Sequence, residues 1–89
     1  MRIDVFLKTC RLVKRRSVAN DLCDRGRVEV AGARAKAGRE VRPGDMLTLR
    51  LPRRRIVAEV VEVPRGNVPK EQASGLYRVI EDKVDTEGP

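Results

Sequence analysis

Two short amphipathic helices are predicted at the start of the chain. The first has apolar residues at the i, i+3, i+4, i+7 spacing of one helix face, namely Ile3, Phe6, Leu7 and Cys10. A second apolar stripe consists of Val18, Ala19, Leu22 and Cys23. It predicts a helix from about Val18 to Arg25, with Ser17 as its N-cap and Gly26 in the left-handed conformation after its end.

The middle of the chain alternates apolar and polar residues, as strands do. Residues 28–30 and 33–35 flank a turn at Ala31-Gly32. Residues 46–51 and 56–63 form a second pair of predicted strands, separated by Pro52 and a basic loop at residues 53–55. This order of elements predicts an α+β fold, with two short N-terminal helices packed on a small, mostly antiparallel β-sheet.

The C-terminal part has the weakest pattern. Residues 70–74 fit a helical turn followed by a short strand at 76–80, but one helix interrupted at Gly75 fits as well. From Asp82 onward the chain is polar, and we expect it to fray. We therefore divide the chain into a domain at 1–64, which includes a hairpin at 46–63, and a short acidic tail at 65–89 that packs on the same domain.

The positive charge is concentrated in the first part of the chain. The net charge is +7, and arginine outnumbers lysine by 15 to 5. Residues 1–55 contain 16 basic and 6 acidic residues, a net +10, whereas residues 56–89 contain 4 and 7, a net −3. Because clustered guanidinium groups match phosphate geometry, this distribution predicts a nucleic-acid partner.

The composition also argues against several kinds of site. There is no histidine and there are only two cysteines, so we expect no metal and no cofactor. Cys10 and Cys23 lie on apolar helix faces and are predicted to be buried free thiols. With one Phe and one Tyr there is no stacking platform for bases, and we place Phe6 in the core and Tyr77 in packing of the tail. Nothing in the sequence predicts catalysis, a membrane span or a signal peptide, so we expect a non-enzymatic cytoplasmic protein.

The candidate RNA-binding residues are basic side chains that lie off the apolar stripes, beside the helix entry at 14–17 or around the turn after the second helix. They are Arg2, Lys8, Arg11, Lys14, Arg15, Arg16, Arg25, Arg27, Arg34 and Lys36. Asp4 has the wrong charge for phosphate, so we assign it to holding the helix start or orienting a nearby arginine. The run at 53–55 is equally compatible with RNA contact and with simple solvation.

A set of short motifs over residues 2 to about 50 resembles the S4-type RNA-binding domain. The motifs are Arg2-Ile3-Asp4-x-x-Leu7, Arg16-Ser17-x-Ala19, Gly26-x-Val28-x-Val30-x-Gly32, Lys36, Val41 and Gly44-Asp45. The turn departs from the family pattern, because Ala31 stands where an asparagine is usual. The run Leu12-Val13-Lys14-Arg15-Arg16 and the short, basic chain resemble the small RqcP-type S4 proteins of ribosome-associated quality control, which are related to a ribosome-binding heat-shock S4 protein.

This resemblance implies a specific set of partners. A protein of the RqcP type would bind 23S rRNA of large ribosomal subunits obstructed by peptidyl-tRNA, as a monomer. It would steady the tRNA near the P site while an RqcH-like factor adds a C-terminal tail to the stalled chain. One alternative is the heat-shock-type role, the recycling of free large subunits carrying nascent chains, although those relatives carry a longer basic extension. A DNA-binding helix-turn-helix protein is disfavoured, because Asp21 and Asp24 would lie on its reading helix.

Overall fold

The computed structural model describes residues 1–84, and the chain begins with the two predicted helices. They are α1 (Ile3–Thr9) and α2 (Arg16–Asp24), which pack against each other. α2 begins two residues before the predicted start at Val18. Ser17 is therefore not the N-cap: that position belongs to Arg15, whose backbone is extended and whose side chain makes no capping hydrogen bond within the described residues.

The apolar faces of the helices supply one side of the core. Ile3, Phe6 and Leu7 are completely buried, which confirms the predicted face of α1. On α2, Ala19 is completely buried but Val18 is 46% exposed. The prediction that Val18 belongs to the buried stripe is thus wrong. The next residue along the helix, Ala19, is rotated by about 100° about the helix axis and belongs to the core cluster instead.

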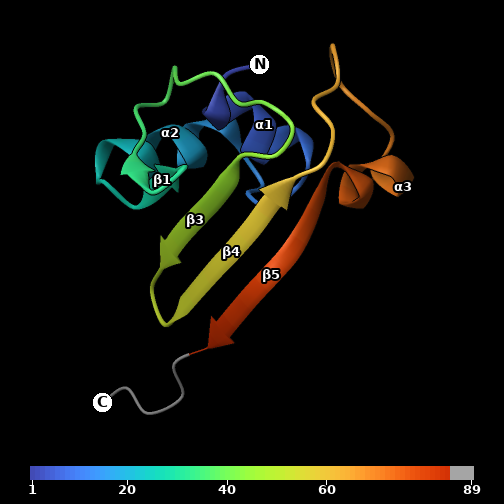
Figure 1. Ribbon diagram of the computed structural model, residues 1–89. Helices are drawn as coiled ribbons and strands as arrows, with labels where there is room; N and C mark the ends of the chain where they lie inside the picture. Colours follow the sequence, from blue (N-terminus) through green and yellow to red (C-terminus); the bar gives the residue numbers. More distant parts are fainter. Residues whose placement is uncertain (85–89) are drawn as a thin grey trace.

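The sheet contains five strands in the order β2-β1-β3-β4-β5, all paired antiparallel. The strands are β1 (Val28–Val30), β2 (Ala33–Arg34), β3 (Met46–Leu51), β4 (Arg54–Val60) and β5 (Tyr77–Val84). The helices lie beside one end of the sheet, and β3, β4 and β5 extend well beyond them (Figure 1). The predicted fold class, helices packed on a small antiparallel sheet, is confirmed.

Two tight turns set the register of the sheet. Val30 pairs with Ala33, so Ala31 and Gly32 form a two-residue turn. Both have positive φ, 53° and 82°, as a type I′ turn requires. Leu51 pairs with Arg54 around Pro52 and a residue of φ 60°, which closes the β3–β4 hairpin.

The basic run after Pro52 is mostly strand, which corrects the predicted loop at 53–55. Arg54 and Arg55 are the first residues of β4, because two residues suffice for the turn. β4 also ends earlier than predicted, at Val60 instead of residue 63. The backbone N–H of the next residue, Val61, donates to the carbonyl of Leu76 at the end of a helical turn.

The tail follows the first of the two predicted alternatives. A helical turn, α3 (Lys70–Ala73), continues into a 3-10 turn, η1 (Ser74–Leu76), and then into β5. The strand continues past Ile80 to Val84, so the fraying expected from Asp82 is wrong for residues 82–84. The remaining part of that expectation, at 85–89, lies outside the described residues.

The hydrophobic core lies between the helices and the sheet. Phe6 is completely buried in this core, as predicted, in one cluster with Leu47, Leu49 and Leu76, while Tyr77 is partly buried and packs against this cluster. No helix within residues 1–84 combines the length and apolarity needed to cross a membrane.

Candidate RNA-binding surface

A buried carboxylate lies at the centre of the basic surface. Asp4 is completely buried, and its Oδ1 accepts from the backbone N–H of Val5 at 2.8 Å. Arg2 donates from Nε to Oδ1 and from Nη2 to Oδ2, both at 3.2 Å. Arg16 donates from Nε to Oδ2 at 3.2 Å, and Asn20 donates to the same oxygen at 3.4 Å. The sequence expectation that Asp4 orients a nearby arginine is therefore confirmed, for two arginines.

The arginines determine the protonation of this carboxyl group. Burial alone would raise the pKa of Asp4, because it removes water from the charged form. Hydrogen bonds from Arg16 and Asn20, together with the charges of Arg2 and Arg16, outweigh that effect, and the pKa lies below its ordinary value. Asp4 is thus ionised at neutral pH.

Both arginines remain accessible from outside. The side chain of Arg2 is 44% exposed and that of Arg16 is 55% exposed. Asp4 uses Nε and one terminal nitrogen of Arg2, and only Nε of Arg16. The outer N–H groups of both guanidinium groups are left for a ligand. Because Asp4 has already restricted their rotamers, the two arginine side chains would lose less conformational entropy when they bind a phosphate.

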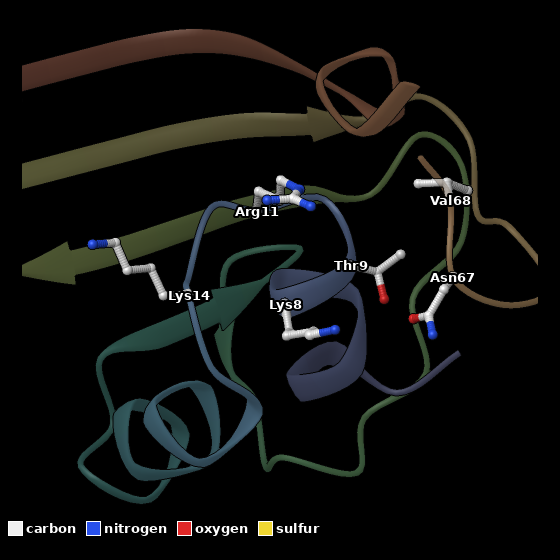
Figure 2. A pocket seen from close by; sticks show the side chains of 6 residues that line it. All are labelled: Lys8, Thr9, Arg11, Lys14, Asn67 and Val68. Atoms are coloured by element: carbon white, nitrogen blue, oxygen red, sulfur yellow. The ribbon is translucent and has the colours of Figure 1, made fainter. Parts of the chain in front are cut away.

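Four further predicted cations lie on exposed positions of α1 and of the segment that joins it to α2. Lys8, Arg11, Lys14 and Arg15 are all exposed, and within residues 1–84 none of their side chains is held by an ion pair or hydrogen bond. Three of them line one pocket of about 360 Å³, together with Thr9 and the loop residues Asn67 and Val68 (Figure 2).

The other predicted residues do not join this cluster. Arg25 forms an i, i+4 ion pair with Asp21 along α2. Arg27 lines a different pocket, at the tip of the β3–β4 hairpin. The guanidinium of Arg34 lies over Gly26, where an added Cβ would come within 2.9 Å of its Cζ. Lys36 is exposed on the segment after β2.

Acidic residues neutralise much of the hairpin tip. Arg54 pairs with Asp82 at 2.7 Å, and Arg55 with Glu81 at 3.6 Å, both across the β4–β5 ladder. Arg50 pairs with Glu29 across the β3–β1 ladder. The hydrogen bond from Arg54 lowers the pKa of Asp82, so this pair is charged at neutral pH. Arg54 and Arg55 therefore help to hold the fifth strand through ion pairs.

The described residues offer little that resembles a catalytic or metal centre. Within residues 1–84 no group of three or more His, Cys, Asp or Glu side chains converges on one point. Cys10 and Cys23 are free and buried, as predicted, and burial raises the pKa of each thiol to about 11. Such thiols are poor nucleophiles and poor metal ligands at neutral pH.

Three residues of this surface were missed by the sequence interpretation. Asn20 helps to hold Asp4, but its role depends on α2 starting at Arg16. Thr9 lies off the apolar stripe of α1, and this position is the only feature of the sequence that could have indicated a role for it. Asn67 comes from a loop some sixty residues away in sequence, and no pattern in the chain brings it next to α1.

Comparison with known proteins gives a consistent picture. Residues 1–47 match the S4 domain family. The chain is 39% identical over 83 residues to a Bacillus subtilis protein named RQC P-site tRNA stabilizing factor, covering 93% of this chain and 95% of that protein. It is 46% identical over 79 residues to the protein of the same name from Halalkalibacterium halodurans, covering 89% of each.

Two solved structures share the fold. The trimeric structure of Vibrio cholerae Heat Shock Protein 15 has a TM-score of 0.81 at 29% identity, covering 89% of this chain and 80% of that one. The solution structure of hypothetical protein HP1423 has a TM-score of 0.79 at 35% identity, covering 91% and 98%. With the motifs, the fold and these similarities agreeing, the chain belongs to the S4 domain family, among relatives named RQC P-site tRNA stabilizing factor.

Proposed function

We propose that this protein is a non-enzymatic RNA-binding factor of ribosome-associated quality control in the cytoplasm. It binds 23S rRNA of obstructed large ribosomal subunits as a monomer, steadies the peptidyl-tRNA near the P site, and supports C-terminal tailing by an RqcH-like partner. The names of its relatives support the quality-control role, and the specific partners come from the family resemblance.

One observation carries the RNA-binding part of the proposal. Two arginines are held by the buried Asp4 with their outer N–H groups accessible, and four exposed cations without protein partners among residues 1–84 lie on α1 and on the segment that joins it to α2. Unpaired, like-charged side chains that lie close together on α1 and the segment after it do not stabilise the fold. Binding of a polyanion to these side chains is favourable, because each phosphate that is neutralised releases counterions.

The arrangement favours recognition of shape over recognition of sequence. Guanidinium groups with fixed orientation can each hold two phosphate oxygens, which positions the protein on a folded RNA. Phe6 is buried and Tyr77 packs on the core, so neither offers an open ring to a base. Binding should therefore depend on backbone geometry and salt, with a log–log salt slope of about −0.7 to −0.9 per phosphate contact.

The test is purification of tagged protein with native large subunits, followed by cryo-EM. We expect density for α1 and α2 against ribosomal RNA next to the P-site tRNA, with an RqcH-like factor on the same particles. Arg15→Ala should reduce recovery of large subunits about tenfold with an unchanged melting temperature, because its side chain has no partner within residues 1–84. Arg78→Ala is the matched control, since Arg78 is exposed on β5 and pairs with Glu59. Recovery of small subunits or DNA alone, or equal loss in both variants, would overturn the proposal.

The heat-shock-type role is a second candidate, favoured by the structural similarity to Heat Shock Protein 15. The two roles differ in what the bound subunits carry. Co-purified subunits that contain a nascent chain but no tailing factor would support recycling, and subunits that contain the factor would support quality control.

A further inference from the structure

The pocket beside α1 contains a polar group that the fold itself does not use. The pocket encloses about 360 Å³ and is lined by Lys8, Thr9, Arg11, Lys14, Asn67 and Val68. Its volume is at the lower end of the range typical of small-ligand sites. Figure 2 shows the Lys8 side chain extending toward Asn67, with Thr9 between α1 and the loop, whereas Lys14 extends away on the other side.

Thr9 is the unusual member of this group. Its residue is 6% exposed, and its hydroxyl oxygen is buried without a hydrogen-bond partner among residues 1–84. Threonine in a helix commonly satisfies its hydroxyl on the carbonyl one turn earlier, and Thr9 does not. A buried hydroxyl left unpaired costs stability, so its retention is explained most simply by a partner that arrives from outside.

Asn67 and Thr9 place two polar side chains in the same pocket. The Thr9 hydroxyl and the Asn67 amide are turned toward one another in Figure 2, although no hydrogen bond joins them. The Asn67 side chain is exposed, so it is free to shift and open the hydroxyl of Thr9 to a ligand in the pocket. A hydroxyl and an amide can both donate and accept, which suits a ligand hydroxyl group that does the same.

The charged side chains of the pocket indicate which other group the ligand carries besides its hydroxyl. Lys8 and Arg11 are exposed and unpaired within the described chain, and no carboxylate lines the pocket. Arg11 also has a φ of 65°, which is an uncommon conformation for a residue with a Cβ. Arg11 directly follows Cys10, the C-cap of α1. The ligand should therefore combine an anion with a hydroxyl group.

We propose that this pocket holds one nucleotide unit of RNA, with its phosphate on Lys8 and Arg11 and its ribose 2′-hydroxyl on Thr9 and Asn67. The proposal rests on the RNA-binding function proposed above and adds to it a means of distinguishing RNA from DNA. The 2′-hydroxyl is the group that differs between the two, and it is both a donor and an acceptor. Thr9 and Asn67 are then specificity residues, whereas Arg15 and Arg16 contribute affinity for either nucleic acid.

The test uses a labelled RNA hairpin and the DNA hairpin of the same sequence, with binding measured by fluorescence anisotropy at fixed salt. We expect the unaltered protein to prefer the RNA. Thr9→Val, which replaces the hydroxyl with a methyl group of similar size, should weaken RNA binding about fivefold and leave DNA binding unchanged. Its melting temperature should rise, because the unpaired buried oxygen is gone. Asn67→Ala should reduce the preference in the same direction.

These readouts separate the proposal from the alternatives. A structural role for Thr9 would lower the melting temperature of Thr9→Val and weaken RNA and DNA binding alike, which would overturn the proposal. Equal affinity of the unaltered protein for the two hairpins would overturn it as well. Failure of the broader RNA-binding function would instead be seen in Arg15→Ala, as unchanged binding to both hairpins and to large subunits.

Discussion

The replacement Asp4→Asn tests whether arginine orientation or net charge governs RNA binding. The amide keeps the shape of the carboxylate but removes its charge. Its NH₂ group is itself a donor, so it cannot accept a hydrogen bond from an arginine as a carboxylate oxygen does. Arg2 and Arg16 donate three hydrogen bonds to the carboxylate. Removing a negative charge from a surface that binds a polyanion should strengthen binding if only charge matters. If Asp4 orients the arginines, binding should weaken.

The magnitudes follow from the exposure of the pair. Hydrogen bonds to charged groups contribute about 1.5–3 kcal/mol and neutral ones about 1 kcal/mol. Because both arginines are about half exposed, solvent screens them, and we take a loss of about 1 kcal/mol for each. The sum of about 2 kcal/mol corresponds to a melting temperature lower by about 10 °C in a domain of this size. Releasing two long side chains costs a further ~1–2 kcal/mol on binding, so RNA affinity should fall about tenfold.

The stability difference should depend on pH. The folded-state pKa of Asp4 lies below its ordinary value, so its contribution is fully present above the unfolded-state pKa near 4 and is lost as the pH falls through the folded-state pKa. Urea unfolding followed by circular dichroism should therefore show a gap between Asp4→Asn and the unaltered protein at pH 7 that narrows below pH 4. Because asparagine does not titrate, the free energy of unfolding of Asp4→Asn lacks this contribution to the pH dependence.

Asp21→Asn is the matched control for this experiment. Asp21 is an exposed carboxylate on α2 that pairs with Arg25. Its replacement should change the free energy of unfolding by no more than about 0.5 kcal/mol and should leave RNA binding equal or slightly tighter. If Asp4→Asn also tightens RNA binding, or if it unfolds at the same urea concentration as the unaltered protein, the orienting role is refuted.

Three further predictions concern single positions. Ala31→Asn should raise the free energy of unfolding by about 0.5–1 kcal/mol in thermal melts, because asparagine tolerates the positive φ of 53°; an unchanged melt would mean that the turn is not strained. Gly26→Ala should lower it by about 1–2 kcal/mol, since φ is 70° at this position and the guanidinium of Arg34 must move aside for the added Cβ. Gly26→Asn is the control, because it adds the same Cβ but tolerates the positive φ, and it should recover only the part of the loss that the φ causes. Cys10 and Cys23 should not react with a thiol reagent at pH 8 until the protein is unfolded in urea, because the pKa of each is about 11 and both are buried; reaction in the folded state would contradict their burial.

Local patterns were sufficient for the parts of the fold that depend on neighbours in sequence. The apolar spacing of α1 and the alternation of β1 and β3 correspond directly to what is buried. The start of α2 was misplaced because Ser17 is a good N-cap in isolation. In the structure, Arg16 donates to Asp4 from twelve residues away, and the helix begins early enough to place it there. A tertiary ion pair of this kind is not visible in the local pattern around Ser17.

The far end of the sheet could not be predicted for a related reason. Arg54 and Arg55 look like a solvated loop when only the residues around Pro52 are considered. Their partners, Asp82 and Glu81, lie in a segment whose own pattern is weak, and only the pairing makes both segments strands. The same limit applies to the pocket, because nothing local connects Asn67 to Thr9.

The position of β5 has a consequence for how the chain folds during its own synthesis. The helices and β1–β4 can pair as soon as residues up to Val60 have left the ribosome, since their contacts are made among themselves. β4 then has an unpaired edge until residues 77–84 emerge, about twenty residues later, and such edges can join to other chains. Arg54 and Arg55 place like charges along that edge during this interval, and the same charges later attract the acidic strand that closes it.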